Sequence, residues 1–294
     1  MPKRAFRVVT DSTADLPPDW ADRYGIEVVP LKVIFGNESF QDGVDLTGEQ
    51  FFERLSASEA LPTTSAPAPG EFAEVYRRLR DECDGVISIH IGSTLSGTAE
   101  AARVGAASVE GFPVRVVDSG TTTMPVAFLC RIAAMSASLD EAVAAVEQRI
   151  SRTRVLALLD TLKFLEKGGR IGKAQYLVGS LLDFKPILRL ADGEVKPADR
   201  VRTRRKAITR LAELLRMDLP VENVAVMYAT DPEDAQELRA TLARELSGVE
   251  VEFGQIGAVL GTHTGPRAMG LVYIRATDRP GGGPTAQATG TSTG

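Results

Sequence analysis

Short apolar runs alternate with amphipathic segments through the first half of the chain. Phe6–Val9 predicts a strand, and Gly85–Ile91 predicts a second, buried strand. Gly70–Cys83 carries apolar side chains at helical spacing and predicts an amphipathic helix. Strand, loop and helix recur at this rhythm through roughly the first 150 residues, which indicates βαβ units and a mostly parallel sheet.

The second half of the chain carries a different pattern. Asp192-Gly193 separates two strand-like segments, Pro186–Leu190 and Glu194–Ala198, and is a strong hairpin signal. The glycine-flanked stretch Gly257–Gly265 is expected to form a loop before a final strand at Gly270–Arg275. Strands and helices are both expected here, with at least one antiparallel pair.

These patterns predict an α/β fold of two domains, because 294 residues are more than one core usually organises. Residues 1–155 are expected to form an N-terminal domain on a mostly parallel sheet. Residues 156–277 are expected to form a second, smaller α/β (α+β) domain. Residues 278–294 consist mainly of Gly, Pro, Thr and Ala, which is typical of a disordered tail.

Composition and charge argue against several classes of protein. The formal net charge of -5 argues against a general nucleic-acid binder, which normally carries a basic surface. Cys83 and Cys130 have no metal-ligand spacing and are expected to be reduced core thiols. No stretch is apolar enough for a signal peptide or a membrane span, so we expect a soluble, cytoplasmic protein.

Three loops of the first half are rich in hydroxyl side chains: Thr10–Thr13, Thr63–Ser65 and Ser93–Thr98. Ligands of parallel sheets bind beyond the carboxyl ends of the strands, where these loops could gather. The Ser93–Thr98 loop precedes a helix and would offer N–H and O–H donors to an anion. A plain helix cap that uses one of these hydroxyls is an equally good interpretation.

His263 and Arg170 are further candidates for contact with an anion. Glycines flank the segment that contains His263 and permit close approach of the backbone, whereas His90 lies in an apolar strand and is expected to be a core residue. Arg170 follows two glycines and faces either a carboxylate or phosphate, or only solvent. The glycines lack P-loop spacing, so a nucleotide site is not supported.

The densest run of positive charge lies before and within a predicted helix that begins near Thr203. Such a run is usually a solvated helix face, and it could also be a docking patch for an acidic or nucleotide-bearing partner. The run consists of Arg200, Arg202, Arg204, Arg205 and Lys206.

The chain resembles the DegV family at seven short motifs, which occur in the family's order and span nearly the whole chain outside the tail. They are Val9–Leu16, Phe40–Asp45, Thr63–Pro67, Leu95–Thr98, Val117–Ser119, Leu165–Ile171 and Gly261–Pro266. Two positions depart from the family pattern: Ala66 replaces a common glutamine, and Arg267-Ala268 stands where a glycine is frequent.

The resemblance implies a non-catalytic protein that encloses one long-chain fatty acid, such as palmitate or oleate, and requires no cofactor or metal. It further implies a role in phospholipid metabolism, in which a separate fatty acid kinase phosphorylates the bound lipid to an acyl phosphate. Arg170 and Arg202 would serve the kinase contact or the phosphate. The residues implied to bind the carboxylate are Thr63 or Thr64, Ser96 with Ser93, and His263.

Two points remain open from the residues alone. Ser96 and His263 could instead be catalytic in a hydrolase or transferase that acts on acyl or phosphoryl groups, although no Gly-x-Ser-x-Gly elbow is present. The apolar lining of a lipid site is also open, and an ordinary core is an alternative use of every candidate. The candidates are Phe164, Leu165, Ile171, Leu177, Leu181, Leu182 and Phe184.

Overall fold

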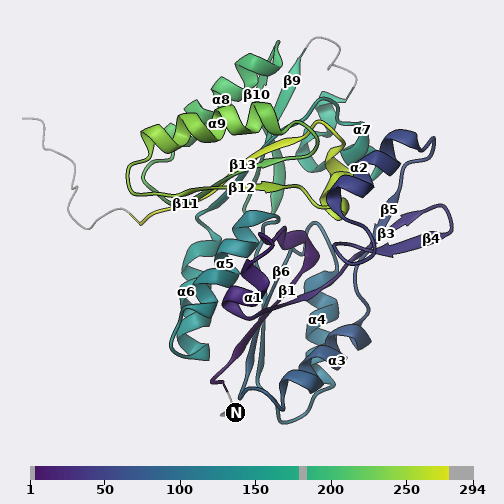
Figure 1. Ribbon diagram of the computed structural model, residues 1–294, viewed down its shortest axis with the longest axis vertical. Coiled ribbons are helices and arrows are strands. Elements are labelled where there is room, and N and C mark those ends of the chain that lie inside the picture. Colours follow the sequence, from purple (N-terminus) through teal and green to yellow (C-terminus); the bar gives the residue numbers. More distant parts are fainter. Residues whose placement is uncertain (1–3, 179–183, 278–294) are drawn as a thin grey trace, which may run out of the picture.

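The computed structural model describes residues 4–178 and 184–277. These residues form two layered units, which lie one above the other in Figure 1. The first unit is built on a four-stranded sheet in which every neighbouring pair of strands is parallel, in the order β2-β1-β6-β7. Its strands are β1 (Arg7–Asp11), β2 (Ile26–Val29), β6 (Val86–His90) and β7 (Val114–Asp118).

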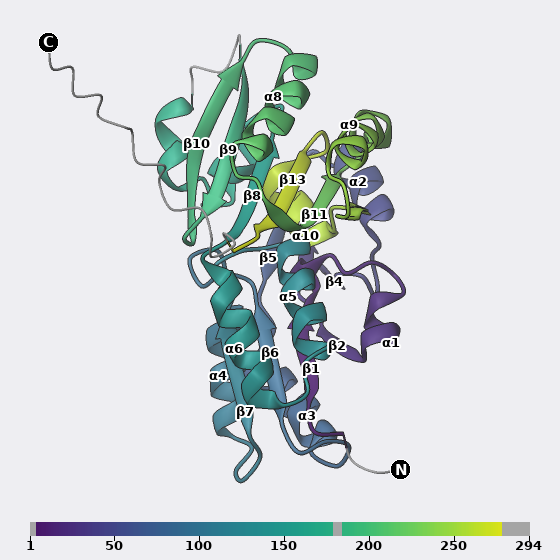
Figure 2. The same ribbon diagram turned by 90° about the vertical axis from the view of Figure 1, so that its left-hand side faces the viewer.

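Helices cover both faces of this sheet (Figure 2). Successive side chains of each strand point to opposite faces, so apolar residues of one strand pack against helices on both sides. In β1, Val9 packs toward α3 and α4, whereas Val8 belongs to the apolar cluster on the side of α5. The helices are α1 (Trp20–Tyr24), α3 (Pro69–Leu79), α4 (Thr98–Ala107), α5 (Met124–Ala134) and α6 (Leu139–Ile150).

The second unit contains a six-stranded sheet in the order β10-β9-β8-β13-β11-β12, antiparallel except for the parallel pair β11 and β12. Helices α8 (Arg204–Arg216) and α9 (Pro232–Glu245) pack on one face. The strands are β8 (Thr153–Leu158), β9 (Lys185–Ala191), β10 (Glu194–Val201), β11 (Val221–Tyr228), β12 (Val251–Gln255) and β13 (Met269–Arg275).

The fold confirms the expected α/β class, the parallel N-terminal sheet and the hairpin at Asp192-Gly193. Because Thr153–Leu158 lies wholly within the second sheet, we propose a domain division just before Thr153, three residues earlier than the sequence indicated. The expected tail at residues 278–294 lies outside the described residues.

A small third sheet corrects one expectation. Thr63–Ser65, expected in a loop, forms β5 and pairs antiparallel with β3 (Lys32–Phe35), which also pairs with β4 (Glu38–Gln41). The pairing supplies partners to backbone groups along an edge of β3, which overrides the loop preference of the flanking prolines. Helix α2 (Gly48–Ala57) lies between β4 and β5 in the sequence and has Thr47 as its N-cap.

A second correction concerns Gly257–Gly265, which was expected to be a loop and contains helix α10 (Ala258–Thr264). Glycine disfavours helices in isolation, but here its small size permits tight packing. A Cβ atom at Gly261 would lie 2.7 Å from ring carbons of Phe51 and Phe52 in α2. Three short elements complete the part of the chain that the structure describes: η1 (Ser12–Ala14), α7 (Lys163–Lys167) and η2 (Gly172–Leu177).

Candidate functional site

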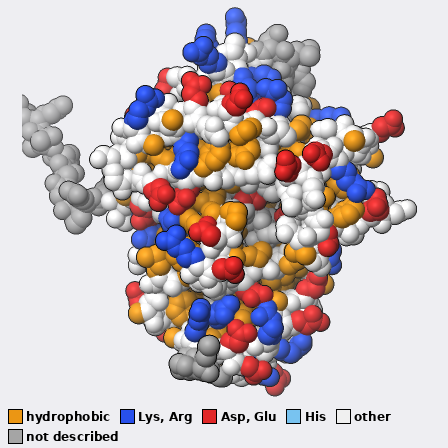
Figure 3. Space-filling model, in the orientation of Figure 1, with side chains coloured by type: hydrophobic (Ala, Val, Ile, Leu, Met, Phe, Trp, Pro, Cys, Tyr) orange, Lys and Arg blue, Asp and Glu red, His pale blue; other side chains and the backbone are white. Residues whose placement is uncertain are grey.

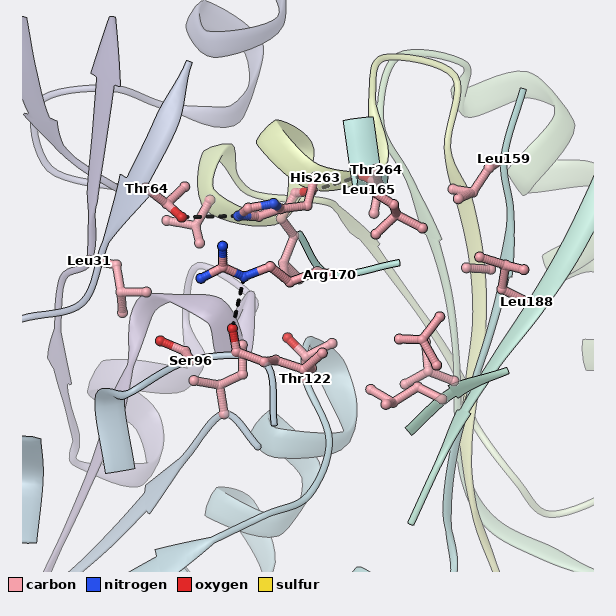
Figure 4. Close-up of a pocket in the computed structure, with 18 of the residues that line it drawn as sticks. Leu31, Thr64, Ser96, Thr122, Leu159, Leu165, Arg170, Leu188, His263 and Thr264 are labelled. Atoms are coloured by element: carbon pink, nitrogen blue, oxygen red, sulfur yellow. Dashed lines mark hydrogen bonds between the residues drawn. The ribbon is translucent and has the colours of Figure 1, made fainter. Parts of the chain in front are cut away.

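A largely apolar cavity lies where the two units and the small sheet meet (Figure 4). Its volume is about 190 Å³. Its apolar lining consists of Leu31, Ala66, Ile91, Leu95, Val155, Ala157, Leu159, Leu165, Leu188, Leu190, Val195, Val259 and Leu260. Its remaining lining consists of Thr64, Ser96, Gly97, Thr122, Arg170, His263 and Thr264.

Strand periodicity explains the apolar wall. Val155 and Ala157 in β8, and Leu159 just beyond it, line the cavity, whereas the intervening Leu156 and Leu158 join the core beneath α8 and α9. Leu188 and Leu190 continue the wall in β9. One face of the second sheet therefore stabilises the fold against its helices while the opposite face lines the cavity.

Polar side chains gather at the other end of the cavity, as Figure 4 shows. Thr64 Oγ1 and His263 Nε2 are 3.0 Å apart, although these residues are 199 positions apart in the sequence. Ser96 Oγ lies 2.8 Å from Thr98 Oγ1. The Arg170 guanidinium donates through Nε to the carbonyl oxygen of Leu95 at 3.1 Å, which holds it beside the Ser96 loop.

The imidazole of His263 is neutral at physiological pH. Its burial and the nearby positive charge of Arg170 lower the pKa of His263 to about 4. Its Nδ1 is buried and has no hydrogen-bond partner in the described part of the chain. A Cβ atom at Gly168 would collide with Nδ1, so the first glycine of Gly168-Gly169 makes room for the ring.

Two buried carboxyl groups hold the helix that carries His263. Asp15 accepts from the Gly257 N–H at 3.0 Å and from the Thr123 hydroxyl at 2.7 Å, and Asp42 accepts from the Ala258 N–H at 3.1 Å. These bonds satisfy backbone donors at the start of α10, which have no partners within the helix. Both acids lie outside the second sheet, so they attach α10 to the first half of the chain.

Burial outweighs these hydrogen bonds, so it raises the pKa of Asp42 to about 6 and also raises the pKa of Asp15. Between pH 4 and 6 the folded protein retains a proton on Asp42 that the unfolded chain releases. The unfolding free energy contributed by this group is therefore greatest below this window and declines as pH rises through about 6.

Asp42→Asn is expected to remove this decline, because asparagine does not titrate. The slope of unfolding free energy against pH between 4 and 6 should change by up to about 1.4 kcal/mol per pH unit. Chemical denaturation at several pH values measures the slope. Asp19→Asn, at an exposed carboxylate, is the matched control and should keep the slope of the unmodified chain. Parallel profiles for all three proteins would contradict the expectation.

The structure brings together four residues that the sequence singled out, namely Thr64, Ser96, Arg170 and His263. Thr63 lines a neighbouring cavity that shares Thr64, Arg170 and His263 with the first. Ser93 is exposed, and its backbone N–H donates to Asp118 at 3.1 Å. Neither of these two residues lines the apolar cavity.

The basic residues between Arg200 and Lys206 differ in their burial and in their ion pairs. Arg202 is exposed beyond β10, at the strand end opposite the Asp192-Gly193 turn, and it lines neither cavity. Arg204 is mostly buried in ion pairs with Asp160, Asp231 and Asp234. Figure 3 shows Lys and Arg side chains along the upper edge of the molecule, at the end that carries β9, β10 and α8 in Figure 1.

Thr122 is a polar lining residue that the sequence analysis did not single out. It is 9% exposed, and its hydroxyl has no hydrogen-bond partner among the described residues. The run of three threonines soon after β7 is a signal visible in the sequence, because loops at this edge of a parallel sheet bind ligands.

Other predicted features can be assigned from contacts. His90 is fully buried and bonds Asp11 and Ser88, which confirms its interpretation as a core residue. Cys83 and Cys130 are buried and unpaired with each other. Among residues 4–178 and 184–277, no group of three His, Cys, Asp or Glu side chains is placed to hold a metal, and no helix is long and apolar enough to cross a membrane.

A family model described as "Uncharacterised protein, DegV family" matches residues 5–276. A DegV domain-containing protein of Streptomyces coelicolor is 40% identical over 277 residues, which cover 92% of this chain and 98% of the relative. The chain belongs to the DegV family. The family resemblance found in the sequence motifs is thereby confirmed.

Solved structures of DegV proteins share the whole fold. A DegV family protein from Thermus thermophilus, described by its fatty acid binding, is 35% identical with a TM-score of 0.86, covering 92% of this chain and 100% of that one. DegV of Bacillus subtilis, described as a fatty acid binding protein, is 33% identical with a TM-score of 0.85, covering 93% and 100%. A stearic acid-binding protein from Eubacterium ventriosum is 26% identical with a TM-score of 0.82, covering 92% and 98%.

Proposed function

We propose that this DegV protein binds one long-chain fatty acid, such as palmitate or oleate, in the cavity between its two units. The observation that carries the proposal is the division of one cavity into an apolar wall and a polar end. The acyl chain would lie along β8 and β9, and its carboxylate would reach Thr64, Ser96, His263 and Arg170. The fatty acid binding described for two DegV relatives that are 33–35% identical supports this assignment.

The energetics suit an amphiphile. Each methylene buried against the apolar wall contributes about 0.8 kcal/mol, which gives affinity without a strict demand on chain structure. A carboxylate at the polar end loses hydration and therefore needs replacement donors. The hydroxyls, the neutral imidazole and the Arg170 guanidinium supply them, and the arginine also supplies a compensating charge.

The role that we propose for the bound lipid is presentation to a separate fatty acid kinase. A carboxylate oxygen would attack the terminal phosphorus of ATP held by that kinase, the bond from that phosphorus to the ADP oxygen would break, and acyl phosphate and ADP would result. This chain would supply no catalytic group and no cofactor of its own. Arg170, at the polar end, would face the phosphate, and the exposed Arg202 would contact the kinase.

The arrangement of Ser96 does not favour hydrolase or transferase chemistry. An activated serine needs a base within hydrogen-bonding reach. Here Ser96 pairs with Thr98, whereas His263 pairs with Thr64. Carboxylate binding uses both residues as hydrogen-bond partners and requires no bond between them.

The first test is the identity of the co-purifying ligand. Native mass spectrometry of the purified chain is expected to find one fatty acid per protein, and lipid extraction should identify it. A ligand-free spectrum, together with no thermal shift when palmitate or oleate is added, would refute the proposal.

Ser96→Ala distinguishes a carrier from an enzyme. We expect an affinity for palmitate about tenfold lower, because one hydrogen bond to a charged group is lost. We also expect the unmodified chain alone to release no product from acyl phosphates or activated esters. Turnover by the purified chain that Ser96→Ala abolishes would assign catalysis to Ser96 instead.

A further inference from the structure

A second cavity adjoins the polar end of the first. Its volume is about 520 Å³. Three residues, Thr64, Arg170 and His263, line both cavities. The two cavities therefore adjoin at the side chains that we propose to bind the carboxylate. The remaining residues that line the second cavity are Glu59, Leu61, Pro62, Thr63, Lys163, Phe164, Lys167, Gly168 and Thr262.

The second cavity is rich in positive charge. Among the described residues that line it, Lys163, Lys167 and Arg170 accompany one acidic residue, Glu59. Within the described ranges, none of the three cations forms an ion pair with a carboxylate, although ion pairs are frequent elsewhere in this molecule. Unpaired cations of one sign around a concave surface attract an anion.

The placement of the two lysines also favours the binding of an anion in the second cavity. Lys163 and Lys167 are the first and last residues of the five-residue helix α7, four positions apart and both exposed. Like charges at this spacing lie on one helix face and destabilise an isolated helix. An anion between them and Arg170 would replace this repulsion with attraction.

We propose that the second cavity binds a phosphoryl group carried on the lipid carboxyl, that is, the phosphate of an acyl phosphate. Lys163 and Lys167 are its charge partners, and Arg170 spans the carboxyl and phosphate positions. This inference rests on the proposed function, because the acyl chain must occupy the first cavity.

The charges favour a phosphate over a second carboxylate. A phosphate carries up to two negative charges and three acceptor oxygens, which match three cationic side chains and the Thr63 hydroxyl. A carboxylate alone is served by the shared residues Thr64, Arg170 and His263. The lysines are therefore expected to matter for the phosphorylated lipid and little for the free acid.

Hexadecylphosphonate is a stable probe of this site, and palmitate is the reference ligand. The double variant Lys163→Gln/Lys167→Gln is expected to bind the phosphonate about tenfold more weakly and palmitate within about twofold of the unmodified chain. Arg205→Gln/Lys206→Gln removes the same charge from exposed positions on α8 and should change neither affinity.

A second measurement needs no variant. Added salt should weaken phosphonate binding by the unmodified chain more steeply than palmitate binding, because exposed charges are screened. Equal salt slopes, or equal losses for both ligands in the lysine variant, would overturn the phosphate site while leaving fatty acid binding intact. Failure of the unmodified chain to bind palmitate would instead overturn the proposed function, and this inference with it.

Discussion

Replacing Ala157 by phenylalanine is expected to lower the affinity for palmitate by about 200-fold. Ala157 lies in the middle of β8 with its side chain toward the cavity, between Val155 and Leu159. A phenyl ring there would take the space of about four methylenes. At about 0.8 kcal/mol for each methylene, their exclusion costs the ligand roughly 3 kcal/mol.

The loss should depend on ligand length, which separates a blocked cavity from a misfolded protein. Isothermal titration with decanoate and palmitate should show a much smaller loss for the shorter acid, which needs less of the cavity. Ala157→Leu adds a smaller side chain and should give an intermediate loss. A uniform loss for both acids, at unchanged thermal stability, would mean that the acyl chain does not pass Ala157.

The sequence predicted β9 as a strand at Pro186–Leu190 but did not predict β8, and it did not show which strand faces line the cavity. Alternation in β8 places Val155 and Ala157 on one face and Leu156 and Leu158 on the other, and both sets are hydrophobic. The choice depends on where α8 and α9 pack, which is a tertiary property. Local pattern therefore could not distinguish a ligand wall from an ordinary core.

For the same reason, the sequence left each candidate lining residue open between the wall of a ligand site and an ordinary core. Of the seven candidates, Leu165 lines the first cavity and Phe164 lines the second. Ile171 and Leu177 are buried in the main core cluster, and Phe184 lies beneath the guanidinium of Arg200. Leu181 and Leu182 lie outside the described residues.

The sequence singled out several residues that the structure gathers at the polar end, because they belong to short motifs. Those motifs identified Thr64 and His263, but their 3.0 Å contact depends on two elements that were expected to be loops. Strand β5 forms because β3 offers it an edge, and α10 forms because Gly261 packs closely against α2. Neither partner surface is visible in the local sequence.

The carboxyl groups that hold α10 show a second limit of prediction from the local sequence. Asp15 and Asp42 were visible in the motifs near the start of the chain, yet nothing in their spacing connected them with residues 257 and 258. Acidic residues near a strand end usually face solvent. Only the fold reveals that these two are buried beside backbone N–H groups of a distant helix.

The polar end also supports the second large expected effect. His263→Ala should lower palmitate affinity by about 30- to 100-fold, because it removes a neutral donor and leaves the Thr64 hydroxyl without its partner. The effect should be nearly constant from pH 6 to 8. With a pKa of about 4, the imidazole of the unliganded protein is protonated in roughly one molecule in a hundred at pH 6.

A double-mutant cycle with Thr64→Val tests whether the hydroxyl and the imidazole act together. Because the two side chains contact each other, the loss in the double variant should be smaller than the sum of the losses in the single variants. Palmitate titration of the four proteins at pH 6, 7 and 8 gives both the coupling and the pH dependence. Strictly additive losses, or an affinity that falls tenfold per pH unit, would mean that His263 binds the lipid as an independent cation rather than as the neutral partner of Thr64.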